Sequence, residues 1–172
     1  MYQSRLAMNT VSLSNEDYFN VQMGKVSLPV QEEAYWNGNT PYVSPIDFGG
    51  LLGIVENTYR LLSDEGLRKS KAYIFPPGTI LISRQFHHFP QIYVLKIDAA
   101  VSFHLYCIQI KTPKQLIPEY VALMLYSIRE QLELFSVGGV LRFLRGDLLK
   151  SISIPLISLE EQKTLVEDKF PL

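Results

Sequence analysis

The segment AYIFPPGTILIS, residues Ala72–Ser83, decides the fold class. The apolar runs Ala72–Phe75 and Ile80–Ser83 are rich in residues that favour strands, and they flank Pro76–Thr79, where proline and glycine favour a tight bend. This pattern predicts a strand, a turn and a second strand. Two further strand-like runs extend the same predicted sheet, at Gln91–Lys96 and Val101–Lys111.

Helices are predicted on the C-terminal side of this sheet. Pro118-Glu119 opens a helix over Tyr120–Phe135 with apolar residues at helical spacing, and Gly138-Gly139 stops it. After a short strand at Ser151–Leu156, Ser158 and Glu161 have the spacing of a capping box. That spacing predicts a last helix that continues to about Lys169.

The N-terminal half is less regular. Ser14 could cap a short helix. Turn-forming residues across Trp36–Gly53 predict a short strand between loops, and the spacing in Leu51–Leu67 fits an amphipathic helix or an irregular segment ended by Gly66. The whole pattern predicts an α+β (mixed α/β) fold, in which a twisted, mostly antiparallel sheet is flanked by helices.

The composition is that of an ordinary globular domain. The chain has 172 residues, of which 47% are hydrophobic and 19% are charged, and this excludes a disordered tail and a coiled-coil rod. A single cysteine, Cys107, excludes an internal disulfide and a thiolate zinc site, so we expect a reducing cytoplasm. No signal peptide and no membrane-spanning run is recognisable, so we expect no contact with a membrane.

Charge is unevenly distributed along the chain. The net charge is −1, but residues 67–150 carry eleven basic and five acidic groups, whereas residues 1–66 carry three basic and eight acidic groups. On composition alone, ordinary surface scatter accounts for such a pattern more readily than a binding surface does.

Residues suited to catalysis do not form a clear constellation. His87, His88 and His104 with Asp98 could suggest a metal site, but adjacent histidines in a strand point to opposite faces. Cys107 lies in an apolar strand with no neighbouring base, which is typical of a buried core thiol. The glycines do not have the spacing of a phosphate-binding loop. We therefore predict no catalytic residue, no metal and no cofactor.

Four short motifs occur in a characteristic order. They combine a turn with tryptophan, glycine and Thr-Pro, a strand leading to an aspartate, a Pro-x-Gly-Thr-Ile-Leu segment, and an Ile-Pro segment before Leu-Glu-Glu-Gln. These motifs are Trp36–Val43, Ile46-Asp47, Pro77–Ser83, and Ile152–Leu156 with Leu159–Gln162. In this order and at these separations, the chain resembles the target-recognition domain of the specificity subunits of type I restriction-modification systems. The resemblance covers roughly Trp36 to Val166.

The resemblance implies a non-catalytic module that recognises double-stranded DNA by its sequence. Such a domain chooses a half-site, while a separate methyltransferase subunit and a motor-nuclease subunit supply the chemistry. It also implies that residues 1–172 form one recognition domain, with a lead-in at 1–34 and the start of a helical spacer at 158–172. The chain departs from the family after Ser83, where a glycine-containing turn and a later Asn-Gln pair are missing.

The segment after Ser83 is our candidate for base readout. Its polar residues should lie on an exposed loop, and arginine and glutamine suit bidentate contacts with guanine and adenine edges. These residues are Arg84, Gln85, His87 and His88. The interleaved Phe86 and Phe89 are interpreted as anchors that hold the loop on the core.

Two basic clusters are candidates for phosphate contacts, although an ordinary solvated surface explains each equally well. The first comprises Arg68, Lys69 and Lys71, and the second comprises Arg142 and Arg145. By family analogy, a methyltransferase would dock near the C-terminal helix, and two copies could pair through that helix to form a homodimer.

Two other classes of function stay open at this point. The first is a protein-interaction or inhibitory module that kept the fold after losing DNA binding. The second is a small hydrolase or metal enzyme that uses His87, His88 or His104.

Overall fold

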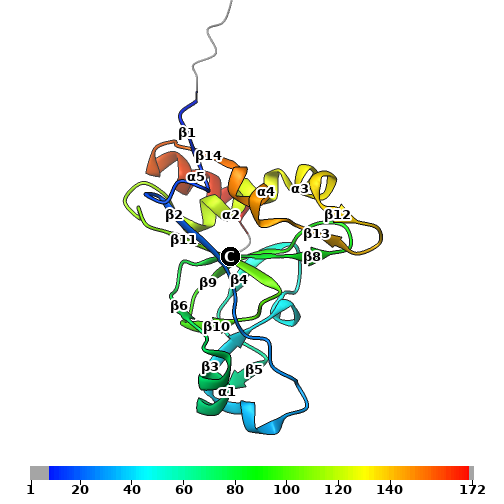
Figure 1. Ribbon diagram of the computed structural model, residues 1–172. Coiled ribbons are helices and arrows are strands. Elements are labelled where there is room, and N and C mark those ends of the chain that lie inside the picture. Colours follow the sequence, from blue (N-terminus) through cyan, green and yellow to red (C-terminus); the bar gives the residue numbers. More distant parts are fainter. Residues whose placement is uncertain (1–7, 171–172) are drawn as a thin grey trace, which may run out of the picture.

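The structure, a computed structural model, describes residues 8–170 (Figure 1). At its centre is a five-stranded sheet with the order β2-β11-β7-β9-β4, in which the β4–β9 pair is parallel and the other pairs are antiparallel. Its strands are β2 (Phe19–Met23), β4 (Leu52–Val55), β7 (Ile80–Ser83), β9 (Ile92–Leu95) and β11 (Leu105–Ile110).

Both faces of this central sheet are buried. On β7, Ile80 and Ile82 pack in the cluster that includes the helices, whereas Leu81 packs in the cluster on the opposite face. Successive side chains of a strand point to opposite faces, so a strand with helices on one side and a second sheet on the other must be apolar throughout. This is why the run from Ile80 to Ile82 contains no polar residue.

The second sheet has four strands in the order β5-β3-β10-β6. The strands are β3 (Trp36–Val43), β5 (Arg60–Leu62), β6 (Ile74–Phe75) and β10 (Ala99–Val101). The β3–β10 pair is parallel, and a small third cluster around Trp36 and Leu62 lies at this end of the molecule. The short helix α1 (Asp64–Ser70) lies beside β3 and β5, with Ser63 as its N-cap.

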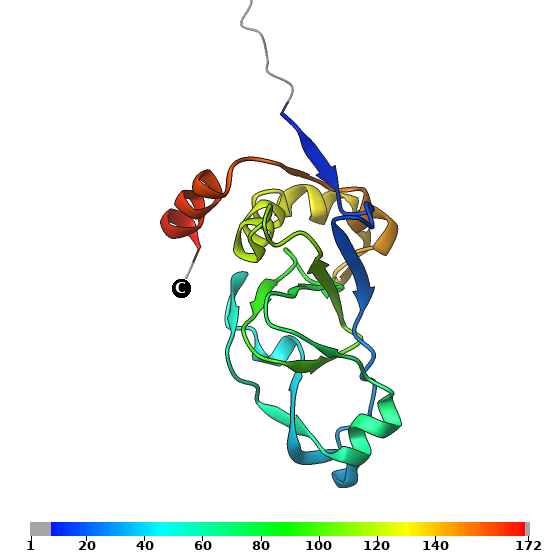
Figure 2. The same ribbon diagram turned by 90° about the vertical axis from the view of Figure 1, so that its left-hand side faces the viewer.

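Helices cover the other face of the central sheet. Helix α2 (Pro118–Ser127) contacts β7 and β9, and it also contacts α5 (Leu159–Lys169), which Figure 2 shows beside it in red. The remaining elements at this end are α3 (Arg129–Phe135), α4 (Gly146–Ser151) and the antiparallel pair of β1 (Thr10–Ser12) with β14 (Ser153–Pro155). No helix within residues 8–170 has the length and apolar character needed to cross a bilayer.

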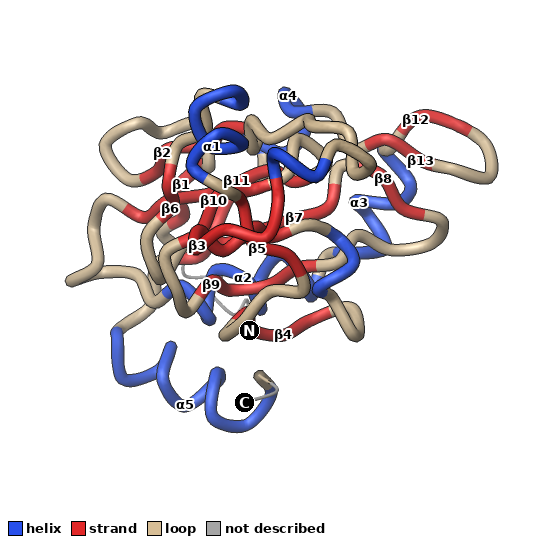
Figure 3. Tube along the Cα trace, turned by 90° about the horizontal axis from the view of Figure 1, so that it is seen from below, coloured by secondary structure: helices blue, strands red, loops and turns tan. Residues whose placement is uncertain are grey.

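A small three-stranded sheet lies at one edge of the molecule, away from α5 (Figure 3). Its order is β12-β13-β8, formed by β8 (Gln85–Phe86), β12 (Val137–Gly138) and β13 (Arg142–Phe143). Both pairings are antiparallel. We call this sheet, together with the loops at residues 87–89 and 139–141, the ribbon.

The predicted mixed α+β fold with mostly antiparallel pairing is confirmed, and so are the two strands joined by a bend at Pro76–Thr79. The expectation that these two strands lie in one sheet is wrong. Strand β6 pairs with β10 in the second sheet, whereas β7 pairs with β9 and β11 in the central sheet. The proline and glycine do bend the chain, and Gly78 has φ of 89°. The bend carries the chain from one sheet to the other, because both faces of β7 need a covering layer.

The helix predicted over Leu51–Leu67 is also wrong. This segment forms β4, β5 and the first turn of α1, and Gly66 lies inside α1 instead of ending a helix. A Cβ at Gly53 would lie 2.7 Å from a ring carbon of Tyr93, so glycine lets β4 approach β9 closely. The apolar residues that recur every three or four positions in this segment therefore lie on two short strands separated by turn residues, and not on one helix.

Three smaller expectations need correction. The residues after Ser14 form a turn that leads directly into β2, not a helix. The strand in Trp36–Gly53 spans all of β3 and is longer than expected. The helix predicted over Tyr120–Phe135 is interrupted at Ile128, where the backbone has φ of −106° and ψ of 18°, so it divides into α2 and α3 before Gly138.

The last helix is confirmed as predicted. The Ser158 hydroxyl accepts a hydrogen bond from the Glu161 amide, and the Glu161 carboxylate accepts one from the Ser158 amide. The Ser158 hydroxyl also holds the pKa of the Glu161 carboxyl below its usual value. The four-residue signal was sufficient here because a capping box is a local interaction.

Candidate nucleic-acid interface

The ribbon brings together two groups of candidate residues that are about fifty positions apart in the sequence. Arg142 on β13 pairs with Phe86 on β8, so the segment after Ser83 and the segment after Gly139 form one surface. Neither segment contains a carboxylate: residues 84–91 and 134–146 hold three arginines and two histidines but no aspartate or glutamate. In a chain with net charge −1, this is a local region suited to an anionic partner.

Arg84 holds the base of the ribbon to the central sheet. Its guanidinium donates a hydrogen bond to the carbonyl of Phe103 at 2.8 Å, and it lies 5.7 Å from the ring centroid of Tyr106. Its backbone amide donates to the carbonyl of His104, and its own carbonyl accepts from the amide of Leu144. Arg84 is half-buried, so its side chain does not extend from an exposed loop as the sequence suggested.

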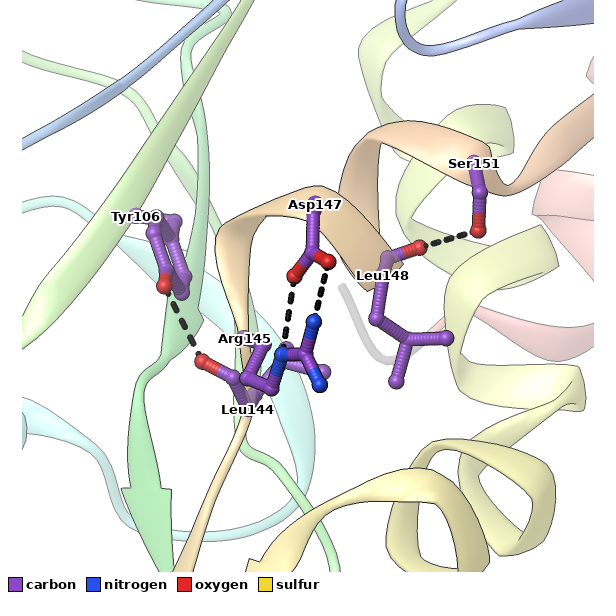
Figure 4. A network of polar contacts seen from close by, with 6 residues as sticks. All are labelled: Tyr106, Leu144, Arg145, Asp147, Leu148 and Ser151. Atoms are coloured by element: carbon purple, nitrogen blue, oxygen red, sulfur yellow. Dashed lines mark hydrogen bonds and ion pairs between the residues drawn. The ribbon is translucent and has the colours of Figure 1, made fainter.

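Tyr106 completes this attachment. Its hydroxyl donates to the carbonyl of Leu144 at 3.0 Å (Figure 4), and its side chain is buried. Because Leu144 directly follows β13, the tyrosine of β11 fixes the point where the ribbon returns to the body of the protein. Sequence reasoning missed this role, since the partner lies 38 residues away.

Gln85, His87 and His88 line an open cavity of about 520 Å³ next to the ribbon. The two histidines are exposed, and the Nδ1 atom of His87 donates to the carbonyl of Val140 at 3.2 Å. His104 also lines this cavity, and burial together with the nearby charge of Arg84 lowers its imidazole pKa. The cavity thus presents two glutamine amides and three imidazoles among apolar side chains.

Phe86 and Phe89, the two aromatic residues after Ser83, differ in how deeply they are buried. Phe86 is buried in the main core cluster, as expected for an anchor. Phe89 is half-buried, and the guanidinium of Arg129 lies 5.5 Å from its ring centroid. Leu141, from the opposite loop of the ribbon, lines the same cavity as both rings.

Arg142 and Arg145 each have an acidic neighbour in the structure. The Nε atom of Arg142 lies 3.7 Å from the carboxylate of Glu133, and Arg145 forms a bidentate pair with Asp147 (Figure 4). The Arg145 side chain is 59% exposed. An exposed pair contributes little to stability, so Arg145 can exchange its carboxylate partner for a phosphate. The Arg142–Glu133 pair is half-buried, with side chains 31% and 26% exposed.

The third group of candidates lies elsewhere. Arg68 and Lys69 are in the last turn of α1 and Lys71 is its C-cap, and Figures 1 and 3 both place α1 apart from the ribbon. Arg68 pairs with Glu65 within the same helix, at 3.2 Å. The nine sequence candidates therefore form two surfaces. The ribbon holds Gln85, His87, His88 and Arg142, while Arg84 directly precedes β8 and Arg145 caps α4 just after β13.

Cys107 and the candidate metal ligands do not form a catalytic or metal site in the described residues. Cys107 is fully buried, and burial raises the pKa of its thiol, as expected for a core residue. Among residues 8–170, no three histidine, cysteine, aspartate or glutamate side chains come together as a metal site would require.

The turn of the ribbon gives the first testable prediction. Gly138 has φ of 121°, and a Cβ at this position would lie 2.3 Å from the carbonyl oxygen of Leu141. Gly138→Ala should therefore open the ribbon at a cost of about 1–2 kcal/mol. We expect faster amide hydrogen exchange at β12 and β13 with unchanged exchange in β7.

The neighbouring glycine supplies the matched control. A Cβ at Gly139 meets no atom within 4 Å. Gly139→Ala should leave exchange in the ribbon at the wild-type rate, and equal exchange in both variants would contradict the assigned role of Gly138.

Solved structures share this architecture at low sequence identity. The chain superposes on a type I R-M system structure with a TM-score of 0.68 and 18% identity, covering 97% of this chain and 38% of that one. The HsdS subunit from Thermoanaerobacter tengcongensis gives 0.64 and 19%, with coverages of 97% and 37%. The type IIG restriction endonuclease BpuSI gives 0.69 and 12%, with coverages of 92% and 26%. These similarities establish the fold, and the chain spans two fifths or less of each solved chain.

Family membership rests on a match along nearly the whole chain. The family model described as the type I restriction modification DNA specificity domain matches residues 9–167. The match begins well before Trp36, where the recognised motifs started, and so includes β1 and β2. The chain therefore belongs to the family of type I restriction modification DNA specificity domains.

Proposed function

We propose that this chain recognises a DNA half-site by its sequence and that the ribbon is the surface that enters the DNA. The observation that carries the proposal is the ribbon itself: two segments without carboxylates are joined into one antiparallel sheet that presents arginine, glutamine and histidine side chains. A two-stranded β-ribbon fits the major groove, as the β12–β13 pair at the end of this sheet could, and the side chains of the sheet can donate to base edges and phosphates. Family membership supplies the class of ligand.

Within this surface the roles differ from those suggested by the sequence. Gln85, His87 and His88 are our candidates for base readout, and Arg142 and Arg145 are our candidates for phosphate contacts. Arg84 acts through its attachment to Phe103 and Tyr106, so we assign it to positioning the ribbon. Arg68, Lys69 and Lys71 form a separate basic surface that this proposal does not require.

The proposal extends to partners by family analogy. We propose that residues 1–172 act as one recognition domain, with a lead-in at 1–34 and a helical spacer that starts at 158–172. We also propose that methylation and cleavage belong to separate methyltransferase and motor-nuclease subunits. Pairing of two copies through α5 would supply the second recognition domain, and a molecular mass measured in solution tests this pairing directly.

Salt dependence of DNA binding tests the surface. The logarithm of the binding constant should fall linearly against the logarithm of salt concentration, and the two contacts assigned to Arg142 and Arg145 should contribute about −2 to this slope. Replacing Arg142 and Arg145 with glutamine should make this slope less steep by about 2, because each phosphate contact contributes about 0.9. Fluorescence anisotropy with a labelled duplex measures both quantities.

The surface at α1 provides the charge-matched control. Arg68→Gln combined with Lys69→Gln removes the same charge, and the Arg68 side chain is 77% exposed. We expect this variant to keep the wild-type slope. A loss confined to the α1 variant would move the DNA-binding surface to α1 and contradict the proposal for the ribbon.

A further inference from the structure

The end of the molecule formed by β3 and β5, which lies opposite α5, carries an open cavity that the proposed function does not use (Figure 1). Its volume is about 550 Å³, and none of its lining residues belongs to the ribbon. Three of the lining side chains are apolar and exposed: Val30 by 51%, Tyr59 by 77% and Leu61 by 40%. Exposed apolar side chains that converge on one hollow are typical of a binding surface, whereas single scattered ones are not.

Arg60 supplies the cation of this cavity. Its residue is half-buried, and its guanidinium carbon lies 5.9 Å from the ring centroid of Trp36 and 5.9 Å from that of Tyr59. Among residues 8–170 it is the one arginine without a hydrogen-bond or ion-pair partner for its guanidinium. The arginines that have such a partner are Arg68, Arg84, Arg129, Arg142 and Arg145. A planar guanidinium held against two rings, with its donors unused, is prepared for a bidentate contact with an acid.

The walls of the cavity are fixed by contacts within the protein. The indole Nε1 of Trp36 donates to the carbonyl of Pro29 at 3.1 Å. Asn37, which also lines the cavity, has φ of 60°. It lies at an irregularity of β3, where Trp36 and Thr40 both pair with Leu62. Such a bulge with a left-handed residue costs free energy, and bulges and strain of this kind are common where a strand aims side chains at a ligand.

Charge around the cavity favours a single carboxylate over a DNA backbone. Residues 28–61 contain four acidic groups and one basic group, Arg60. Glu33 lines the cavity as well, so a row of phosphates that passed Arg60 would meet this carboxylate, and the lining contains no second cation to balance it. One carboxylate of a peptide needs only the one guanidinium. Apolar side chains next to it can cover Tyr59 and Leu61, and basic residues further along the peptide would complement the acidic surroundings.

We infer that this cavity docks a segment of a partner protein. The segment places an aspartate or glutamate carboxylate on the guanidinium of Arg60 and an apolar side chain against Tyr59 and Leu61. The inference goes beyond the proposed function and does not depend on it. Because this cavity and the cavity beside the ribbon have no lining residue in common, the protein segment and DNA can be bound at the same time.

Trp36 reports occupancy directly, because it is the single tryptophan of the chain and lines the cavity. The probes are two pools of blocked pentapeptides, Lys-Xaa-Asp-Xaa-Lys and Lys-Xaa-Asn-Xaa-Lys, in which Xaa is leucine, valine or phenylalanine. The aspartate pool should change the tryptophan emission saturably, with an apparent Kd of about 1 mM or lower. The asparagine pool should bind about tenfold more weakly, because it lacks the charge-assisted pair with Arg60.

Three variants separate the guanidinium from the apolar wall. Arg60→Gln should bind both pools as weakly as wild type binds the asparagine pool. Tyr59→Ser should weaken binding of both pools and keep the preference for aspartate. Arg68→Gln is the matched control, because the Arg68 side chain is 77% exposed and lies outside the cavity, so it should keep the wild-type preference. All three variants should melt close to wild type, since none of them removes a fully buried side chain.

The inference is overturned if the aspartate pool leaves the tryptophan emission unchanged, if wild type binds both pools equally, or if Arg60→Gln keeps the preference for aspartate. Duplex DNA is the third probe. It should leave the emission of Trp36 unchanged, and Arg60→Gln should bind it with the wild-type affinity and salt dependence. DNA that changes the emission and binds more weakly to Arg60→Gln would show that a phosphate occupies the cavity, which also overturns the inference.

Discussion

Replacing Gln162 with leucine is expected to lower the free energy of unfolding by about 3–5 kcal/mol, the largest loss we predict from a single change. The side chain of Gln162 is fully buried, and its carbonyl oxygen accepts from the amide of Ile117 at 2.9 Å. Its amide nitrogen donates to the carbonyls of Gln115 and Ile157, at 2.7 and 2.9 Å. Leucine would fill similar space but leave the Ile117 amide and the carbonyls of Gln115 and Ile157 without these partners, each costing about 1 kcal/mol or more at a part-buried position.

Urea denaturation measures this loss directly. Because about 1 kcal/mol shifts the melting temperature of a domain of this size by 2–4 °C, we also expect a fall of roughly 10 °C. Lys163→Ala is the control, since Lys163 is the exposed next residue on α5 and its replacement should change stability by less than about 0.5 kcal/mol. A Gln162→Leu variant within 1 kcal/mol of wild type would show that Gln162 does not join α5 to the start of α2.

Gln162 also illustrates how far the sequence predicts the fold. The capping box at Ser158 and Glu161 identified the start of α5, because both partners lie within one turn. The role of the next residue was not predictable, since Gln115 and Ile117 lie more than forty positions away along the chain. The same limit explains why the strand runs around Ile80, Ile92 and Leu105 were predicted, whereas the pairing of β6 with β10 was not.

The candidate site follows the same rule. The sequence identified the polar residues after Ser83 and the two arginines after Gly139 as separate groups. Their union depends on the pairing of Arg142 with Phe86, a contact between segments about fifty residues apart. Both segments lack carboxylates, and this shared feature of the sequence could have suggested that they belong to one surface. Tyr106 gave no such signal, because a buried tyrosine in an apolar strand looks like any core residue.

Replacing Arg84 with methionine is expected to weaken sequence-specific DNA binding at least tenfold and to lower the free energy of unfolding by about 2 kcal/mol. Methionine keeps most of the apolar stem but removes the guanidinium, which donates to the carbonyl of Phe103 and lies over Tyr106. A hydrogen bond from a charged group contributes about 1.5–3 kcal/mol. The buried Nε atom has no hydrogen-bond partner among residues 8–170, so removing it offsets part of this loss.

Two tyrosine variants separate the effect of Arg84 on the position of the ribbon from its effect on stability. Tyr106→Phe removes the hydrogen bond to the carbonyl of Leu144. Tyr120→Phe removes a similar bond outside the ribbon, from α2 to the carbonyl of Pro155 on β14, at 2.9 Å. Each should destabilise the protein by about 1 kcal/mol. Only Tyr106→Phe should weaken specific binding and speed hydrogen exchange in β12 and β13, as Arg84→Met does.

His104 reports on Arg84 independently of DNA. Burial and the charge of Arg84 both hold the imidazole pKa of His104 below its usual value, so stability associated with the neutral imidazole is present above the unfolded-state pKa, near 6.5, and is lost as the pH falls below it. In Arg84→Met the charge is gone and burial remains, so the pKa should rise part of the way towards its usual value. This titration, followed by NMR, should accompany the loss of specificity. A wild-type pKa in the variant would mean that the charge of Arg84 does not act on His104. Unchanged DNA specificity together with a shifted pKa would mean that Tyr106 and the strand pairing alone orient the ribbon.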